Sequence, residues 1–309
     1  MRIRVLAGVI VIVVLMSSES AAAPRYSDWG QPTNLGVVVN STSADSGPAL
    51  SKDGLALYFT SRRPGGLGGE DLWVAQRASS QDAWGAPANL GAPVNTTGDD
   101  RVPTLSRDEH WLLYGSTRPG GFGSFDIWAS WRENVHDAFA WQEPVNLGPN
   151  INTAAAEIAP AIFENEGSVG SELYFNSTKP GVGGPDLYMS TRDANGAWGP
   201  AILLVQLDTI WNDSRPAIRH DGLELLFMSD RPGGFGGLDL WVTTRATTAD
   251  AWSAPLNLGP TVNTSFDDFQ VCISSDGQTL VFGSTRPGTL GLADLYTSTR
   301  MKQTGRPQQ

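Results

Sequence analysis

The chain has 309 residues, with 32 Asp and Glu against 21 Lys and Arg, and its net charge at pH 7 is −11. Such a balance argues against nucleic acid or an anionic membrane surface as a partner, because both require clustered basic side chains. A single Cys excludes an internal disulfide, and the 35 Gly, 20 Pro and 11 Trp, with few stretches of helical periodicity, favour an all-β fold.

Residues 1–23 have the layout of a secretory signal peptide, with a basic start, an apolar run and small residues before a cleavage point. The apolar run, Val5 to Met16, is shorter than the about 20 residues that a membrane-spanning helix needs. A tethering helix is the alternative for this segment. We expect export to the periplasm or the extracellular space, without stable membrane insertion after the signal is removed.

One sequence unit occurs five times along the chain. Its most regular part is Ser-x-Arg-Pro-Gly, as in Ser61 to Gly65, followed by Asp-Leu-aromatic, as in Asp71 to Trp73. Repetition at such a period is typical of propellers and other repeat architectures. An acidic residue precedes each copy, at intervals of 55, 57, 56 and 55 residues: Asp45, Asp100, Glu157, Asp213 and Asp268.

Each unit contains four segments with the composition of short β-strands. In the first unit they are residues 48–51, 55–60, 71–77 and 84–90. The Pro- and Gly-rich stretch between the second and third segments is a hairpin connection, since Gly tolerates positive φ and Pro cannot donate to a central strand. Pro87 places the fourth segment at an outer edge for the same reason. The unit therefore predicts one propeller blade.

The order of the segments predicts how the ring closes. The chain begins with a fourth-strand segment, residues 29–36, and ends with a third-strand segment, residues 294–300. Pairing the two would complete the last blade and remove two open sheet edges. We predict a five-bladed β-propeller of four-stranded antiparallel blades, forming a single domain over residues 24–301, followed by a disordered tail at 302–309.

The Ser-x-Arg-Pro-Gly-Gly and Asp-Leu-Trp units resemble the PD40, or WD40-like, β-propeller repeats of TolB-type periplasmic proteins. The resemblance covers residues 29–301 and implies the propeller fold. TolB has an additional N-terminal domain and more blades, which this chain lacks. A TolB-like scaffold role in the cell envelope is therefore one alternative for the function.

Residues that recur in every unit are interpreted as structural, because a feature of all five blades seldom defines one site. Each unit pairs its acid with a base, which we expect to tie loops to strands through charge-assisted hydrogen bonds. The recurring tryptophans are expected to pack the blades. The bases are Arg63, Arg118, Lys179, Arg231 and Arg286, and the tryptophans are Trp29, Trp84, Trp141, Trp198 and Trp252.

A binding site is expected where the repeats differ, in the loops that join a fourth strand to the next first strand at one mouth of the channel. Aromatic rings there can stack on sugars, and Arg can grip carboxylates. The predicted function is non-enzymatic binding of a glycan or a protein segment by a monomer without cofactor or metal. The predicted ligand-binding residues are Asp99, Arg101, Trp211, Arg215, Phe266, Phe269 and Gln270. Packing between blades is the alternative for Trp211 and Phe266.

A carbohydrate-active enzyme, either a glycoside hydrolase or a lyase, is a further alternative. The three histidines, His110, His136 and His220, fall in turns and outer connections that do not converge on that mouth, which disfavours a Ser–His–Asp triad. A mechanism based on carboxyl groups alone stays open. Its candidate acids are Asp100, Glu157, Asp213 and Asp268.

Overall fold

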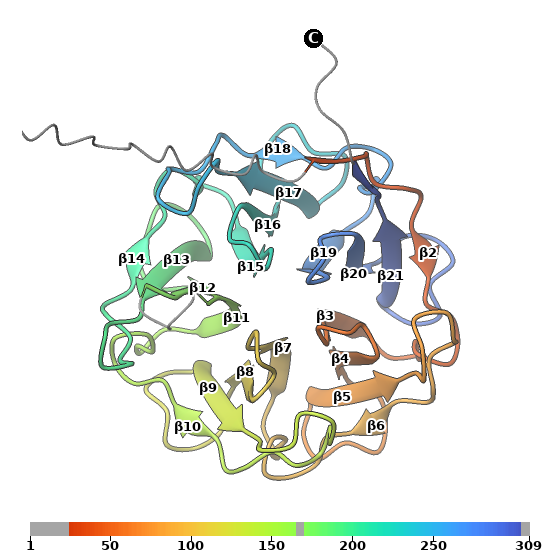
Figure 1. The fold of residues 1–309 in the computed structure, drawn as a ribbon, viewed down its shortest axis with the longest axis horizontal. Helices are drawn as coiled ribbons and strands as arrows, with labels where there is room; N and C mark the ends of the chain where they lie inside the picture. Colours follow the sequence, from red (N-terminus) through yellow and green to blue (C-terminus); the bar gives the residue numbers. More distant parts are fainter. Residues whose placement is uncertain (1–24, 165–169, 304–309) are drawn as a thin grey trace, which may run out of the picture.

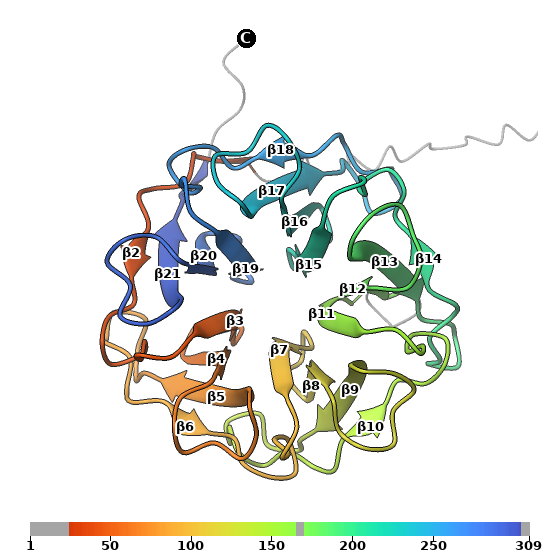
Figure 2. The same cartoon turned by 180° about the vertical axis from the view of Figure 1, so that it is seen from behind.

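The computed structural model describes residues 25–164 and 170–303, and the predicted signal peptide lies outside them. Five four-stranded antiparallel sheets stand around a central axis, so the predicted five-bladed propeller is confirmed. Figures 1 and 2 show the ring from its two faces. No helix that could span a membrane occurs in these two ranges.

The strands fall into four concentric rings. The inner strands are β3 (Asp45–Leu50), β7 (Asp100–Leu105), β11 (Glu157–Phe163), β15 (Asp213–Ile218) and β19 (Asp268–Ile273). The second strands are β4 (Ala56–Ser61), β8 (Trp111–Ser116), β12 (Glu172–Ser177), β16 (Glu224–Ser229) and β20 (Thr279–Ser284). The third strands are β5 (Asp71–Gln76), β9 (Asp126–Trp131), β13 (Asp186–Thr191), β17 (Asp239–Thr244) and β21 (Asp294–Thr299). The outer strands are β6 (Ala88–Asn89), β10 (Val145–Asn146), β14 (Ile202–Leu203), β18 (Leu256–Asn257) and β2 (Thr33–Asn34).

The two ends of the chain close the ring as predicted. β2 pairs with β21, with Thr33 opposite Thr297 and Asn34 opposite Tyr296. A second pairing joins β1 (Arg25–Tyr26) to β22 (Lys302–Gln303), two residues that the sequence assigns to the tail. The Tyr26 ring helps to hold this second pairing in place, because the guanidinium of Arg300 lies 4.0 Å from its centroid.

The outer strands are shorter than predicted. The segment 84–90 contributes only Ala88 and Asn89 to the sheet. Pro87 cannot donate a ladder hydrogen bond, and Trp84 lies under the guanidinium of Arg77, 4.2 Å from its ring centroid. The predicted packing role of the recurring tryptophans is confirmed: three are buried, and all five lie under an arginine.

Every inner strand bulges at its third residue, and this shapes the channel. The backbone there has positive φ, and the register with the second strand shifts at the same point. In four blades the next residue is Pro, which has no N–H for the ladder, so the break in pairing costs no hydrogen bond there. The five residues are Gly47, Val102, Ala159, Arg215 and Gln270, with φ of 56°, 52°, 57°, 58° and 51°.

The recurring acids and bases are structural in four blades, as the sequence predicts, whereas Lys179 of the remaining blade lies over the ring of Tyr188. Asp45 is fully buried, and Arg63 donates to it at 2.6 Å while also donating to the carbonyl of Val39. The same ion pair is formed in three other blades, by Asp100 with Arg118, Asp213 with Arg231, and Asp268 with Arg286. Apolar clusters then fill the space between neighbouring blades, as where Leu72 of β5 joins Leu112 of β8.

Candidate functional site

The central channel has two ends with different residues. We call the end formed by the starts of the inner strands and the connections that precede them the loop mouth; it comprises residues 43–47, 98–102, 155–159, 211–215 and 266–270. The other end, formed by the turns between first and second strands, is called the turn mouth. The sequence-predicted binding residues all belong to the loop mouth.

Three of the predicted binding residues lie on inner strands at the loop mouth. Arg101, Arg215 and Gln270 start from β7, β15 and β19, which face one another around the channel (Figure 1). The groups that act electrostatically on Arg215 are Arg101 and Glu70, which belong to blades on the far side of the ring from β15. The inner-strand bulge at Arg215 thus brings its guanidinium under the influence of side chains from two other blades.

Glu70 is a functional candidate that sequence reasoning missed. It lies directly before β5, and its carboxylate accepts from Nε of Arg62 and from Nη1 of Arg101, each at 3.2 Å. The corresponding residues of the other blades are Phe125, Pro185, Leu238 and Ala293, so this acid is peculiar to one blade. Comparison of the five units at the position before the recurring Asp would have found it.

The mouth cluster, defined as Arg62, Glu70, Arg101 and Arg215, is held by its neighbours. Asp99 accepts the backbone N–H of Glu70 at 2.9 Å. The Arg101 guanidinium lies 3.9 Å from the ring centroid of Phe125, in a cation–π contact. These contacts fix Glu70 and Arg101 in place, which is a requirement for a precise binding site.

Several polar atoms at this mouth have no hydrogen-bond partner among the described residues. They are Nε of Arg101, Oγ of Ser214, Nη1 of Arg215 and Oε1 of Gln270, all buried at the level of the atom. Burial lowers the pKa of the Arg215 guanidinium to about 9, with the positive charge of Arg101 acting in the same direction. Arg215 is therefore still a cation at pH 7, and a buried charged donor without a partner is costly.

The predicted aromatic residues lie outside this cluster. Trp211 and Phe266 are 43% and 42% exposed and stand in the connecting loops at the rim. Phe269 is half-buried and packs against the backbone of Gly283 in its own blade. The rim therefore offers two open aromatic faces, whereas Phe269 fills space within a blade.

The four predicted catalytic acids are not free to act. Asp100, for example, is fully buried and accepts from the backbone and hydroxyl of Thr96, from Ser116 and from Arg118. Glu157, Asp213 and Asp268 are equally buried and bonded within their own blades. These carboxyl groups hold the loops of their own blades.

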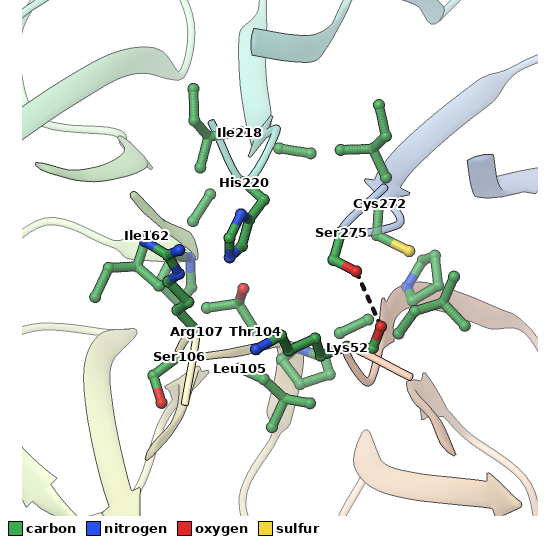
Figure 3. A pocket seen from close by; sticks show the side chains of 18 of the residues that line it. Lys52, Thr104, Leu105, Ser106, Arg107, Ile162, Ile218, His220, Cys272 and Ser275 are labelled. Carbon is green, nitrogen blue, oxygen red and sulfur yellow. Dashed lines mark hydrogen bonds between the residues drawn. The ribbon is translucent and has the colours of Figure 1, made fainter. Parts of the chain in front are cut away.

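The turn mouth leads into a cavity of about 130 Å³ inside the channel, lined by all five inner strands. Figure 3 shows Arg107 and His220 at this end, and Ser275 donating to the carbonyl of Lys52 at 2.9 Å. Burial lowers the pKa of His220, and the charges of Arg107 and Lys52 lower it further, so its imidazole is neutral at pH 7. His220 thus lines the channel, but from the end opposite the loop mouth.

Other sequence-predicted features of the channel can be placed. Burial raises the pKa of the Cys272 thiol to about 12, which fits a small apolar side chain and not a nucleophile. Nδ1 of His110 lies 2.8 Å from the carbonyl of Arg132, away from the axis. In the two described ranges, no group of three or more His, Cys, Asp or Glu side chains is arranged to hold a metal ion.

Solved structures of low sequence identity share this fold. The catalytic domain of a GH62 α-L-arabinofuranosidase from Coprinopsis cinerea has a TM-score of 0.60 at 13% identity, over 88% of this chain and 98% of that one. An α-L-arabinofuranosidase from Podospora anserina, solved in complex with cellotriose, has a TM-score of 0.58 at 13% identity, over 89% and 98%. A putative TolB from Agrobacterium tumefaciens has a TM-score of 0.50 at 15% identity, over 85% and 78%. No protein-family model and no curated protein sequence matches the chain.

These comparisons correct the functional prediction. The sequence favoured a non-enzymatic binding propeller, whereas the similar structures are mainly glycoside hydrolases. The lack of converging histidines is no argument against this chemistry, because glycoside hydrolysis uses carboxyl groups.

Proposed function

We propose that this chain is a glycoside hydrolase whose substrate binds at the loop mouth. The observation that carries the proposal is the mouth cluster, where an acid peculiar to a single blade pairs with guanidinium groups at the loop mouth. A five-bladed propeller places such a cluster at the centre of one face, where loops from all blades can contact a ligand. The similarity of the fold to arabinofuranosidase structures supports this choice of reaction.

Glu70 and Asp99 are the carboxyl groups that we assign to the chemistry. Hydrolysis of a glycosidic bond requires two carboxyl groups beside a sugar whose ring gains positive charge in the transition state. Glu70 is held by Arg62 and Arg101 and is positioned to stabilise that charge. Asp99 lies beside it, bound to its backbone N–H, and can supply the second carboxyl group.

The rim gives the site a means of holding a sugar chain. The exposed rings of Trp211 and Phe266 can stack on the apolar faces of sugar units that extend outward from the axis. A glycan ligand agrees with the cellotriose bound to the Podospora anserina enzyme. Export by the predicted signal peptide would place the protein with extracellular or periplasmic polysaccharides.

The repeats also support an origin within the PD40 family. The TolB structure shares the fold over 85% of this chain, and the Ser-x-Arg-Pro-Gly units resemble that family. In this proposal the repeated residues of the family determine the blade fold, and the residues that differ between blades determine the activity.

The test is release of reducing sugar from arabinan, arabinoxylan, xylan and pectin by purified residues 24–309. We expect turnover of at least one of them, reduced about 100-fold or more in kcat by Glu70→Gln, because one of the two carboxyl groups is lost. Glu133→Gln is the matched control, since Glu133 is exposed in the outer connection after β9. Absence of turnover on every glycan, or full activity in Glu70→Gln, would contradict the proposal.

A further inference from the structure

The mouth cluster has more positive than negative charge, in a chain whose net charge is −11. Arg62, Arg101 and Arg215 contribute three guanidinium groups, and Glu70 forms ion pairs with Arg62 and Arg101. Among the described residues, Arg215 forms no ion pair within 4 Å. Asp99 is half-buried next to Glu70 and already accepts a backbone N–H. The cluster can therefore accommodate a further negative charge.

The polar atoms without partners describe what would satisfy the cluster. Nε of Arg101 and Nη1 of Arg215 are donors only, so they require acceptor oxygens. Oε1 of Gln270 is an acceptor, so it requires a donor such as a hydroxyl group. A carboxylate with a hydroxyl group nearby offers both, and that combination is present in a uronic acid, whereas a neutral sugar would leave Arg215 without a counter-charge.

The bulge in the inner strands makes room for this arrangement. Gly47 occupies in β3 the position that Arg215 and Gln270 occupy in β15 and β19. A Cβ at Gly47 would lie 3.3 Å from Oε1 of Gln270, so the missing side chain leaves space for the amide. The same position is therefore small in two blades and polar in two others, as an asymmetric site on a symmetric ring requires.

We infer that the mouth cluster binds the carboxylate of a uronic-acid-bearing glycan, with Arg215 as its main charge partner. The inference deepens the proposed function, on which it rests for the glycan nature of the ligand. Arg101 shares its guanidinium between Glu70 and the ligand, and Gln270 accepts from a hydroxyl group of the same sugar. Paired guanidinium groups suit a carboxylate because they donate in a forked geometry.

The experiment is calorimetric titration of purified residues 24–309 with matched pairs of oligosaccharides. One pair is galacturonate trimer and galactose trimer; the other is xylotetraose with and without a glucuronic acid branch. We expect binding of the acidic member to be tighter by about tenfold or more, and this preference to weaken with added salt. Equal binding of both members of each pair would overturn the inference.

Variants test whether the preference for acidic oligosaccharides depends on the mouth cluster. Arg215→Gln is expected to remove the preference for the acid, and Arg215→Lys to restore part of it, because Lys keeps the charge but not the fork. Arg107→Gln at the turn mouth is the control and should keep the preference. Folding is checked by thermal unfolding, in which Arg215→Gln should be at least as stable as the parent, since it removes a buried charge without a partner. A preference that survives in a folded Arg215→Gln would also overturn the inference.

The two proposals can fail separately. Hydrolysis of neutral glycans with no preference for acidic ones would support the hydrolase and overturn uronate recognition. Binding of uronates that depends on Arg215, without cleavage of any glycan, would support the recognition site and overturn the hydrolase.

Discussion

At the residue scale, the candidate site arises from charged residues at positions where most of the other blades have small or apolar residues or Thr. Glu70 replaces an apolar residue, and Arg62 replaces the Thr found in three other blades. Arg215 replaces a small or apolar side chain at a bulge whose backbone conformation is the same in every blade. Because the scaffold already fixes the backbone, single substitutions suffice to place charged groups at the axis.

Asp208 is another residue that differs from its equivalents in the other blades, and we expect it to affect the free energy of unfolding. The other blades have Asn here, as in Asn95, which both accepts from the N–H of Leu72 and donates to its carbonyl. Asp208 accepts the N–H of Leu187 at 2.8 Å, but its other oxygen has no partner among the described residues. Burial raises its pKa to about 8, with a smaller contribution from the nearby charges of Asp186 and Asp213.

This raised pKa predicts a pH-dependent stability. Unfolded Asp208 ionises near pH 4, while the folded residue keeps its proton to about pH 8, so the free energy of unfolding falls as pH rises between these values. Asp208→Asn removes that loss and restores the donor. We expect the variant to unfold at a higher temperature than the parent, with a larger difference at pH 8 than at pH 5. An equal difference at both values would contradict the assignment.

At the scale of the strand, the inner-strand bulge is the element that forms the site. It interrupts the pairing of β15 with β16 between Ser214 and Ala217 and turns the intervening residues toward the axis. Val102 adopts the same positive φ although it is β-branched, a conformation that is unfavourable for such a residue. The ring thus imposes the bulge on whatever residue occupies the position.

Gly47→Ala tests how tightly the bulges pack. The new Cβ would lie 2.9 Å from Oγ1 of Thr60, the hydroxyl that accepts the N–H of Val102 in the next blade. We expect a loss of about 2–4 kcal/mol in the free energy of unfolding, from the left-handed backbone and the displaced hydroxyl. Gly36→Ala, also at positive φ but with open space around it, should cost about 1 kcal/mol. Equal losses in urea unfolding would show that the contact is unimportant.

At the scale of the whole molecule, closure by the two ends of the chain holds the ring together. The N-terminal β2 completes the blade of β19, β20 and β21, and Asn34 donates to Asp294 at 2.8 Å across that seam. Contacts between neighbouring blades run around the full circle, with β19 packed on β3. The mouth cluster depends on this closure, because its members come from three different blades.

Removal of residues 24–36 tests the seam. The deletion exposes the edge of β21, so we expect a lower unfolding temperature and aggregation through the open edge. A synthetic peptide of residues 24–36 should raise the unfolding temperature again in a concentration-dependent way, since it binds the folded state. A truncated chain that unfolds like the intact one would mean that the seam adds little to stability.

The sequence by itself determined the number of blades, the order of strands within each blade and the closure by β2. These features follow from local signals, namely turn residues at fixed offsets and a repeated pattern of apolar strands, and each unit repeats the same signals five times. It also identified Arg101, Arg215 and Gln270 at the loop mouth, because they stand where the repeats differ.

Only the tertiary structure decided which of these residues meet. The residue at the bulge itself does not reveal it, since Gly, Val, Ala, Arg and Gln all occupy that position, although Pro follows it in four blades. Likewise, Asp100 and Glu157 are residue types that can act as catalytic acids. In the structure, however, Asp100 pairs with Arg118 and Glu157 accepts from the hydroxyl of Thr153. Interactions between residues 31 to 145 positions apart depend on the curvature of the closed ring, as the hydrogen bond from Arg101 to Glu70 and the electrostatic effect of Glu70 on Arg215 do. No local pattern in the chain encodes that curvature.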